Sequence, residues 1–425
     1  MHVRHVGDVV RVRGLQRLGP IDAGYMSGVT AAGGADDVWD VVVVGAGPAG
    51  AAAALGALRV DPTMRVLLLD RADFPRDKCC GDGIAPHVLD VLGSVGAGDV
   101  VRGWTPLRRL EIARAGHGVE GVLARPAWVI PRTVFDARLV SRAVAAGAVL
   151  RRQRVSSVHQ RPRGTVVDGT TWAKVVIGAD GAHSAVRSSL RARAHHARAL
   201  AVRGYAPTPE RRRGVQVIRF GGRRQPSYAW AFDRGDGLSN VGYGELLDRN
   251  GSAPAPTRST MMEQLDELLP GAGAGGTQWR GHHLPLSGWR WHQPDGATLL
   301  AGDAAGLVNP MTGEGIYYAV ATGVLAGRAA ARAVAAGTPA AAGRRYRRHV
   351  RRLLASHLRH TWVVSRLSRR PVVLDAGLRA AGRDALVFDD LVEIGLGDGR
   401  ITPRLAAGLV AGFVADVNRV SSHRR

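Results

Sequence analysis

Near its N-terminus the chain reads Asp40-Val41-Val42-Val43-Val44-Gly45-Ala46-Gly47-Pro48-Ala49-Gly50, followed by Ala51-Ala52-Ala53-Ala54-Leu55. Four β-branched residues in succession predict a buried strand, and the alanine run predicts a helix. Gly45, Gly47 and Gly50 stand at the joint with G-x-G-x-x-G spacing. In this motif the first glycine permits a tight turn, the second lets the backbone approach a pyrophosphate, and the third lets helix and strand pack closely. The stretch therefore predicts a dinucleotide-binding turn whose phosphate meets a helix N-terminus.

A second buried strand completes this motif. Residues 65–69, Arg-Val-Leu-Leu-Leu, end in Asp70, twenty residues after Gly50. A carboxylate at that distance can accept hydrogen bonds from a ribose 2′-hydroxyl. Another match to the glycine spacing occurs at residues 271–276, but it follows Leu-Leu-Pro instead of a strand, and no helical pattern comes after it. We therefore predict a flexible loop there.

The composition is that of a globular protein with two or three domains. The chain has 425 residues, of which 45 % are hydrophobic, so it can bury a sizeable core. Its net charge is +23, but its 58 basic residues include only two lysines, Lys78 and Lys174. The arginine bias extends over the whole chain and forms no nucleic-acid-binding module, so we predict no nucleic-acid partner.

One region departs from this even distribution. The sixty residues between Glu314 and Asp375 contain twelve arginines and no acid. Apolar residues recur at helical spacing among the arginines, which predicts a basic amphipathic helix. Two interpretations stay open for Arg344 to Arg370: a solvated face packed on its own domain, or contact with an anionic membrane surface or a diphosphate-bearing substrate.

The cysteines and the N-terminus indicate the compartment. Cys79 and Cys80 are adjacent and unsuited to a structural disulfide, which fits a reducing cytoplasm. Residues 1–36 have no clear periodicity and no apolar stretch typical of a signal peptide, so we expect a disordered extension. We predict a cytoplasmic protein, with the inner face of the membrane as the place of any peripheral contact.

His282-His283 has no Cys or carboxylate partner at ligand spacing, so we predict no metal site.

Further strands end in polar or glycine-rich segments. Residues 71–83 follow Asp70 and form a polar loop, at the sheet edge where ligands bind. Residues 149–158 predict another strand, and the alternating pattern of residues 200–245 predicts an antiparallel sheet facing the substrate. Two more buried strands run into short polar motifs, namely residues 172–177 into Gly178-Ala179-Asp180-Gly181 and residues 297–301 into Gly302-Asp303, with Gly313-Glu314-Gly315-Ile316 and a long alanine-rich helix after them.

The Gly45 turn and the Asp180 and Asp303 strand ends together resemble the FAD-binding motifs of the para-hydroxybenzoate hydroxylase-like flavoproteins. Within that group the chain resembles the geranylgeranyl reductase family over about residues 38 to 415. The segments that carry this resemblance are Phe74–Gly83, Tyr228–Phe232, Gly302–Ile316 and Leu396–Pro403. One departure is Asp233, where the family usually has proline after the phenylalanine.

The resemblance implies FAD as the cofactor and NADPH, NADH or ferredoxin as its external electron donor. It implies FAD contacts from Gly45, Gly47, Ala49, Gly50, Asp70, Arg71, Cys80, Gly81, Asp82, Arg132, Val155, Asp180, Gly302, Asp303, Gly313, Gly315 and Ile316. It also implies that Tyr228, Trp230 and Phe232 line a lipid cavity, for which core packing is the alternative. Cys80 is the expected catalytic residue, and its alternative role is a small side chain packed under the flavin.

We predict an α/β fold with a Rossmann-type FAD-binding domain of parallel strands and helices, an antiparallel β-sheet substrate domain and a C-terminal helical segment. The predicted ranges are 1–36 for the extension, 37–105, 130–190 and 297–335 for the FAD-binding domain, 106–129 and 200–296 for the substrate domain, and 336–425 for the C-terminal helices.

The resemblance implies an FAD-dependent oxidoreductase that reduces carbon-carbon double bonds of an isoprenoid substrate, a geranylgeranyl or polyprenyl chain on a quinone or lipid. The hydride would come from flavin N5. Two other enzyme classes share the FAD motifs and stay open as alternatives: an aromatic monooxygenase and a flavin-dependent halogenase. A halogenase carries Trp-x-Trp-x-Ile-Pro where residues 228–233 of this chain read Tyr-Ala-Trp-Ala-Phe-Asp.

Overall fold

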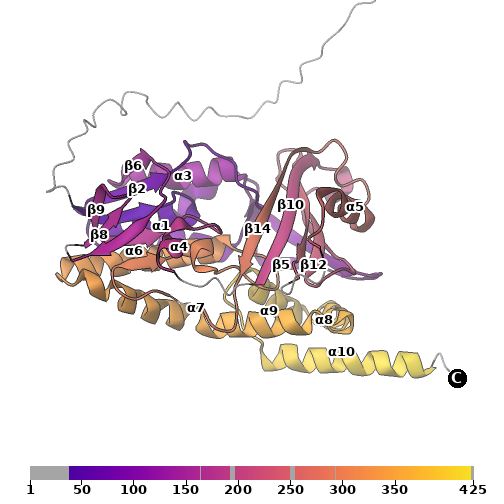
Figure 1. The fold of residues 1–425 in the computed structure, drawn as a ribbon. Helices are drawn as coiled ribbons and strands as arrows, with labels where there is room; N and C mark the ends of the chain where they lie inside the picture. The colour runs from indigo at the N-terminus through magenta and orange to yellow at the C-terminus, as the bar shows by residue number, and fades with distance from the viewer. Residues whose placement is uncertain (1–37, 163, 192–196, 249–253, 292, 423–425) are drawn as a thin grey trace, which may run out of the picture. The chain divides into compact units, whose positions relative to one another are not determined.

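The computed structural model describes residues 38–162, 164–191, 197–248, 254–291 and 293–422 (Figure 1). Residues 38–425 form one compact unit. The predicted N-terminal extension, residues 1–36, lies outside the described residues. The two sheets, the helices around them and the C-terminal helices are described below for this unit alone.

The first sheet is the predicted dinucleotide-binding sheet, with strand order β6-β2-β1-β9-β8-β7 and β15 paired with β9. Its strands are β1 (Trp39–Val44), β2 (Val66–Asp70), β6 (Val149–Arg152), β7 (Val158–Arg161), β8 (Gly164–Val167), β9 (Thr171–Gly178) and β15 (Thr298–Leu300). β6, β2, β1, β9 and β15 are parallel to one another, whereas β8 pairs antiparallel with β9 and β7. Residues 41–43 and 67–69 are fully buried, as continuous apolar runs in a parallel sheet require.

Helices α1 (Pro48–Leu58) and α6 (Ile316–Ala335) pack beside this sheet, and α3 (Arg132–Ala145) packs on α1. α1 and α6 approach each other closely because small residues face each other along both helices. A Cβ atom on Gly323 would lie 2.2 Å from the Ala49 carbonyl oxygen, and one on Gly327 would lie 1.9 Å from that of Ala53. α6, near the C-terminal third of the chain, is thereby fixed to the helix that follows the glycine turn.

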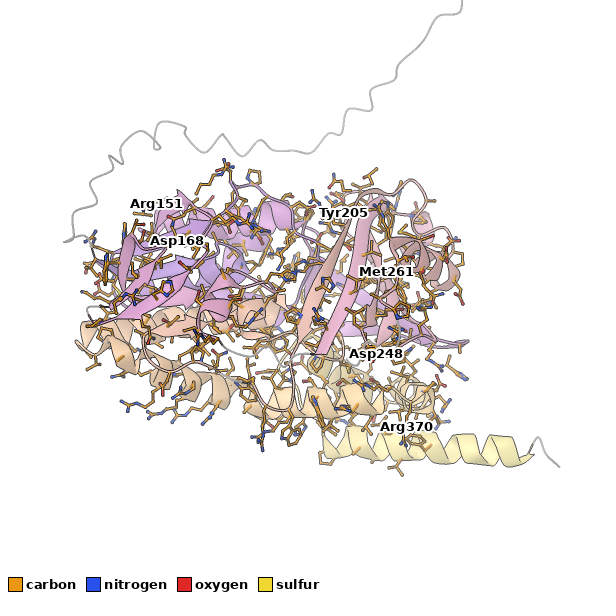
Figure 2. All side chains as sticks on the ribbon, viewed as in Figure 1. Arg151, Asp168, Tyr205, Asp248, Met261 and Arg370 are labelled. Carbon is orange, nitrogen blue, oxygen red and sulfur yellow. The ribbon has the colours of Figure 1, made fainter. Side chains whose placement is uncertain are left out.

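One strand prediction was wrong. Residues 149–158 were expected to form one strand, but β6 ends at Arg152 and β7 begins at Val158. The Asp168 carboxylate accepts the N–H groups of Ser156 and Ser157, both at 2.9 Å, so these groups bond to a side chain and not to a neighbouring strand. Figure 2 labels Asp168 at the first sheet. Val155 therefore lies in a loop.

The second sheet has the order β14-β10-β13-β12-β11-β4-β5-β3 and is antiparallel except for the β11–β4 pair. Its strands are β3 (Gly83–Ile84), β4 (Leu107–Arg114), β5 (His117–Val129), β10 (Ala197–Pro207), β11 (Val215–Phe220), β12 (Ser227–Asp233), β13 (Leu238–Leu246) and β14 (Thr277–Leu286). Helix α5 (Arg258–Leu268) buries Met261 and Leu265 against this sheet (Figure 2). The antiparallel sheet predicted for residues 200–245 is confirmed, and so is the predicted fold class.

The C-terminal region is helical, as predicted. It consists of α7 (Ala342–Leu367), α8 (Pro371–Arg383), α9 (Ala385–Leu396) and α10 (Pro403–Ser422) (Figure 1). α7 is the predicted basic amphipathic helix: Tyr346, Val350, Leu354 and Leu358, four residues apart, are fully buried, and most of its arginines are exposed. None of the described helices is long and apolar enough to cross a membrane. We retain the predicted domain boundaries as a proposal.

Candidate active site

A cavity of about 1340 Å³ connects both sheets and the C-terminal helices. Most of the predicted cofactor contacts line it, namely Gly45, Gly47, Ala49, Asp70, Arg71, Cys80, Gly81, Asp82, Arg132, Val155, Asp180, Asp303, Gly313, Gly315 and Ile316. The predicted substrate residues Tyr228, Trp230 and Phe232 line the same cavity. The structure therefore brings the two predicted groups to one place, while their contacts with FAD and substrate stay predictions.

Two predicted residues, Gly50 and Gly302, are absent from the cavity wall and shape the site through packing. A Cβ atom on Gly50 would lie 1.7 Å from the Gly45 carbonyl oxygen, so any side chain there would separate α1 from the turn. Gly302 has φ +56°, and its Cβ position lies 3.2 Å from Ala49. Both glycines hold helices against the turn, which is the role that the motif assigns to its third glycine.

The glycine turn is approached by two arginine side chains. At Gly47 the Cβ position lies 3.2 Å from Arg76 Nη2 and 3.9 Å from Arg132 Nη2. Pro48 begins α1, so the first backbone N–H groups of the helix are next to these guanidinium groups. Free helix N–H groups together with cationic side chains form a binding site for phosphate. This arrangement fits the pyrophosphate of a dinucleotide.

The two arginines share one counter-ion. Arg132 and Asp136 are buried and joined by two hydrogen bonds, from Nε at 2.6 Å and from Nη2 at 2.8 Å. Arg76 Nη1 lies 3.2 Å from the same carboxylate. Burial would lower the pKa of Arg132, but Asp136 outweighs this effect and holds the pKa above its ordinary value. Arg76 Nε also lies 3.9 Å from Asp70 Oδ2, so two arginines and two carboxylates surround the turn, and both guanidinium groups reach the Gly47 backbone. Arg76 lies in the family segment Phe74–Gly83 but was not among the predicted cofactor contacts.

Asp70 lies at the end of β2, where the ribose contact is expected. Its Oδ2 accepts the Ala46 N–H at 2.8 Å and its Oδ1 accepts the Ala72 N–H at 3.0 Å. These bonds orient the carboxylate toward the turn and leave further lone pairs for a hydroxyl donor. The placement fits the predicted ribose contact.

Asp303 joins two distant segments of the chain. It lies in the short helix η4 (Gly302–Ala305) after β15, and its Oδ2 lies 3.0 Å from Nζ of Lys78 in the loop after β2. Burial would raise the pKa of Asp303, but the Lys78 ammonium outweighs burial and holds the pKa below its ordinary value. The carboxylate is therefore an ionised acceptor at the cavity wall. Lys78 was not among the predicted site residues, because this contact spans 225 positions of sequence.

The loop around Cys80 is fixed by Asn240 of β13. Asn240 Nδ2 donates to the Cys80 carbonyl and to Asp82 Oδ2, each at 2.8 Å. Asp82 has φ 60°, a conformation uncommon for a side-chain-bearing residue, and burial raises its pKa to about 6. Burial also raises the pKa of the Cys80 thiol, so near neutral pH it is a neutral thiol and not a thiolate.

The aromatic strand face lies against this loop. The ring centroids of Tyr228 and Trp230 are 5.9 Å apart, and those of Trp230 and Phe232 are 6.4 Å apart. A Cβ atom on Gly81 would lie 3.6 Å from the Phe232 ring and 3.9 Å from Trp230 Nε1. Trp230 Nε1 donates to Asn240 Oδ1 at 2.8 Å, which satisfies the only polar atom of this buried ring. The aromatic wall and the Cys80 loop are therefore parts of one surface.

Glu314 belongs to the segment Gly313–Ile316, but it was not among the predicted site residues. It lines the cavity directly before α6, and its Oε1 accepts the Tyr317 N–H at 2.8 Å. Burial raises the pKa of Glu314 to about 7, although the N–H groups of Tyr317 and Ile316 oppose the shift. The cavity therefore contains a carboxyl group that changes its charge near neutral pH.

The cavity continues into an apolar channel between the C-terminal helices. The channel residues are Val364, Leu367, Val372, Val373, Leu374, Leu378, Leu391, Val392, Leu396, Leu405, Leu409, Val410 and Phe413, from α7, α8, α9 and α10. The sequence predicted helices here but gave no sign of a channel, because apolar residues at helical spacing look the same in a core and in a channel wall. The lining fits a long apolar ligand.

Among the described residues, neither His282 nor His283 belongs to a group of three side chains whose ligand atoms lie close together. The one group in the described ranges that brings three ligand atoms within 4.8 Å of one another consists of His87, Glu393 and Asp398. His87 Nε2 lies 3.0 Å from Glu393 Oε2, which we interpret as an ion pair between α2 (Pro86–Gly93) and α9.

Comparisons with known proteins identify the family. A family model described as an FAD binding domain matches residues 38–216. The menaquinone reductase of Mycolicibacterium smegmatis is 34 % identical over 312 residues, which cover 68 % of this chain and 75 % of that protein. The digeranylgeranylglycerophospholipid reductase 1 of Methanopyrus kandleri is 32 % identical over 328 residues, which cover 70 % of this chain and 81 % of that protein. The chain belongs to the geranylgeranyl reductase family.

A solved structure agrees with the fold of this family member. A geranylgeranyl bacteriochlorophyll reductase-like protein from Thermoplasma acidophilum superimposes with a TM-score of 0.71 at 19 % identity, covering 91 % of this chain and 99 % of that one. The predicted family and the prediction of an FAD-dependent oxidoreductase are confirmed. FAD is supported as the cofactor by the matched FAD binding domain and by the arginine-flanked glycine turn.

Proposed function

We propose that this geranylgeranyl reductase family member reduces carbon-carbon double bonds in the prenyl chain of a quinone or lipid. One observation carries the proposal: a single cavity is lined both by the dinucleotide turn and by the apolar channel residues of the C-terminal helices. The names of relatives support it, since they include a menaquinone reductase and a digeranylgeranylglycerophospholipid reductase. A prenyl chain has few polar groups, so a long apolar channel is the feature that would select it.

The chain's own residues would hold the cofactor through three kinds of contact. Arg76 and Arg132 would bind the pyrophosphate above Gly47, and Asp70 would accept a ribose hydroxyl. Asp303 would accept ribityl hydroxyls while Lys78 keeps it ionised. When bound, FAD supplies hydride chemistry that no amino-acid side chain provides. The remaining predicted contacts belong to the same proposal.

Tyr228, Trp230 and Phe232 would position the substrate. Their rings form an apolar wall next to the Cys80 loop, so a chain lying on this wall would present a double bond beside the place of the reactive cofactor atoms. The wall also excludes water, which protects a reduced cofactor from side reactions. Which double bond is reduced would depend on how far the chain advances along the wall.

Reduction of an alkene also consumes a proton, and we propose Cys80 as a residue that handles it. Its thiol is neutral because burial raises its pKa, so it can hold a proton at Sγ near neutral pH. Cys80→Ser, with FAD binding measured by fluorescence, tests this role. A large fall in turnover with unchanged FAD affinity is the expected result, and wild-type turnover would assign Cys80 to packing.

The electron donor is proposed as NADPH, NADH or ferredoxin. In the described ranges, the glycine motif of residues 45–50 follows a strand and opens a helix, whereas that of residues 271–276 does not. We propose that a nicotinamide donor would bind transiently. Anaerobic mixing with each donor, followed by flavin absorbance, distinguishes the three. Bleaching by one donor alone identifies it, and bleaching by none contradicts this part of the proposal.

The proposed reaction is tested by incubating the FAD-loaded protein with a polyprenyl quinone whose ring is already reduced and a chemical reductant, with oxygen excluded, and measuring product mass. A prenyl reductase adds only the mass of two hydrogens per saturated bond. An aromatic monooxygenase is inactive without oxygen and adds an oxygen atom when oxygen is present. Turnover only in air would overturn the proposal in favour of that class.

A further inference from the structure

Three apolar side chains mark an opening of the channel. Leu367 at the end of α7, Val372 at the start of α8 and Val410 on α10 line the cavity, yet 45 %, 41 % and 63 % of their surface is exposed. A side chain that lines a cavity and also reaches solvent stands where the cavity meets the outside. We call these three residues the apolar rim. α8 and α10 pack on each other, so Val372 and Val410 belong to neighbouring helices (Figure 1).

The rim is accompanied by arginines. Arg366, Arg369 and Arg370 are exposed and lie within a few positions of Leu367 and Val372. Arg370 itself lines the cavity, and Figure 2 shows it at the side of α10. The sequence has no acid between Glu314 and Asp375, and the first acid after the rim, Asp375, lies 2.7 Å from Arg114. The opening therefore combines apolar side chains with exposed basic groups such as Arg366 and Arg370.

Trp362 of α7 forms a pair with Trp289, which lies after β14. The rings of Trp289 and Trp362 are 5.4 Å apart, and 44 % of Trp289 is exposed. Arg359 stands over Trp289 and Arg366 over Trp362. Partly exposed tryptophans next to arginines are typical of surfaces that meet the headgroup region of a membrane.

We propose that the apolar rim and its arginines dock on an anionic phospholipid bilayer, and that the prenyl chain passes through the rim directly from the bilayer into the channel. The inference rests on the proposed function. Its physical reason is that a prenyl chain dissolved in a bilayer would lose its apolar surroundings if it crossed water to reach the site. An opening pressed against the bilayer removes that step, and arginines around it attract an anionic surface.

Vesicle binding tests the docking without any turnover. The FAD-loaded protein is sedimented with phosphatidylcholine vesicles and with vesicles that also contain phosphatidylglycerol. We expect binding to the anionic vesicles that falls with added salt, since exposed charges are screened within a Debye length. Arg366→Gln with Arg369→Gln should lower the partition coefficient roughly thirtyfold, because each surface arginine contributes about a fivefold increase. Val372→Asp should also lower it.

Matched controls carry the same changes elsewhere. Arg211→Gln with Arg213→Gln removes two charges at the β10–β11 connection, and Leu238→Asp places a charge on an apolar residue that is 37 % exposed at the start of β13. Both should bind anionic vesicles as the wild type does. Equal partition of Val372→Asp and Leu238→Asp, or equal binding of the wild type to neutral and anionic vesicles, would overturn the proposal.

A kinetic comparison tests the passage of the chain. Neither Arg366 nor Arg369 lines the cavity, so their double variant should reduce a short-chain prenyl quinone in detergent at the wild-type rate. With a long-chain quinone embedded in anionic vesicles it should be at least tenfold slower. Equal rates on the vesicle substrate would overturn the direct passage. If no variant reduces either quinone, the proposed function fails, and the vesicle-binding result still decides whether the rim docks.

Discussion

Replacing Glu314 by glutamine removes one titratable group from the cavity wall and keeps the size of the side chain. Burial raises the pKa of Glu314 from 4.5 to about 7, so the folded protein favours the neutral acid. A raised pKa of this kind contributes stability that is fully present below about pH 4.5 and is lost as the pH rises through about 7. Glutamine does not titrate, and its amide oxygen can still accept the Tyr317 N–H. The variant should therefore gain stability over the wild type as the pH rises.

The size of the effect follows from the pKa. Moving it from 4.5 to about 7 corresponds to about 3 kcal/mol, at about 1.4 kcal/mol per pH unit. Part of this free energy is already lost at about pH 5.5, so about 2 kcal/mol should appear between about pH 5.5 and 8.5. Across that range the free energy of unfolding of the wild type should fall by this amount relative to Glu314→Gln.

Urea unfolding of the FAD-free protein at several pH values measures this difference. FAD is removed because a bound ligand would add its own binding free energy to the apparent stability. Glu267→Gln, an exposed carboxyl group on α5, is the matched control for losing one carboxylate. Parallel stability curves for the wild type and Glu314→Gln over this range would refute burial as the dominant influence on Glu314.

Three further predictions concern the cofactor and the substrate wall. Asp303→Ala should weaken FAD binding by about 1 to 3 kcal/mol, measured by calorimetry on the FAD-free protein, and unchanged affinity would reject the ribityl contact. Gly50→Ala should prevent folding, because its Cβ would lie 1.7 Å from the Gly45 carbonyl oxygen. Gly93→Ala, where nothing lies within 4 Å of the Cβ position, should leave thermal unfolding unchanged or raise its midpoint. Tyr228→Ala should move the reduced double bond to another isoprene unit in fragment mass spectra; an unchanged position would remove Tyr228 from the wall.

The parts of the fold that could be predicted are those written in local sequence. The apolar run of residues 41–44, the glycine turn and the helix after it depend on neighbouring residues, and all three were predicted. The strand expected over residues 149–158 was wrong because Asp168, outside that range, takes the N–H groups of the intervening loop. Periodicity within a segment cannot reveal such a competitor.

The parts of the site that were missed depend on contacts between distant segments. Lys78 acquires its role from Asp303, 225 positions away, and Arg76 acquires its role from Asp136 and the glycine turn. Glu314 precedes a predicted helix, where a carboxylate is ordinary, and only its burial makes it unusual. The C-terminal channel was missed because its apolar residues fit a closed core equally well. A family motif located the site, and the structure was needed to show what surrounds it.

The central claim is that a prenyl double bond, and not oxygen, is the electron acceptor at this site. A single-turnover measurement tests it most directly. The bound FAD is reduced chemically, and oxygen and excess reductant are then removed. A geranylgeranyl-bearing quinone whose ring is already reduced is mixed in while flavin absorbance is recorded. The analogue with the same head group and a fully saturated chain is the control. We predict that the unsaturated compound restores the oxidised flavin spectrum with one double bond saturated per flavin, and that the saturated analogue leaves the flavin reduced. Reoxidation by neither compound without oxygen, or by both alike, would contradict the claim.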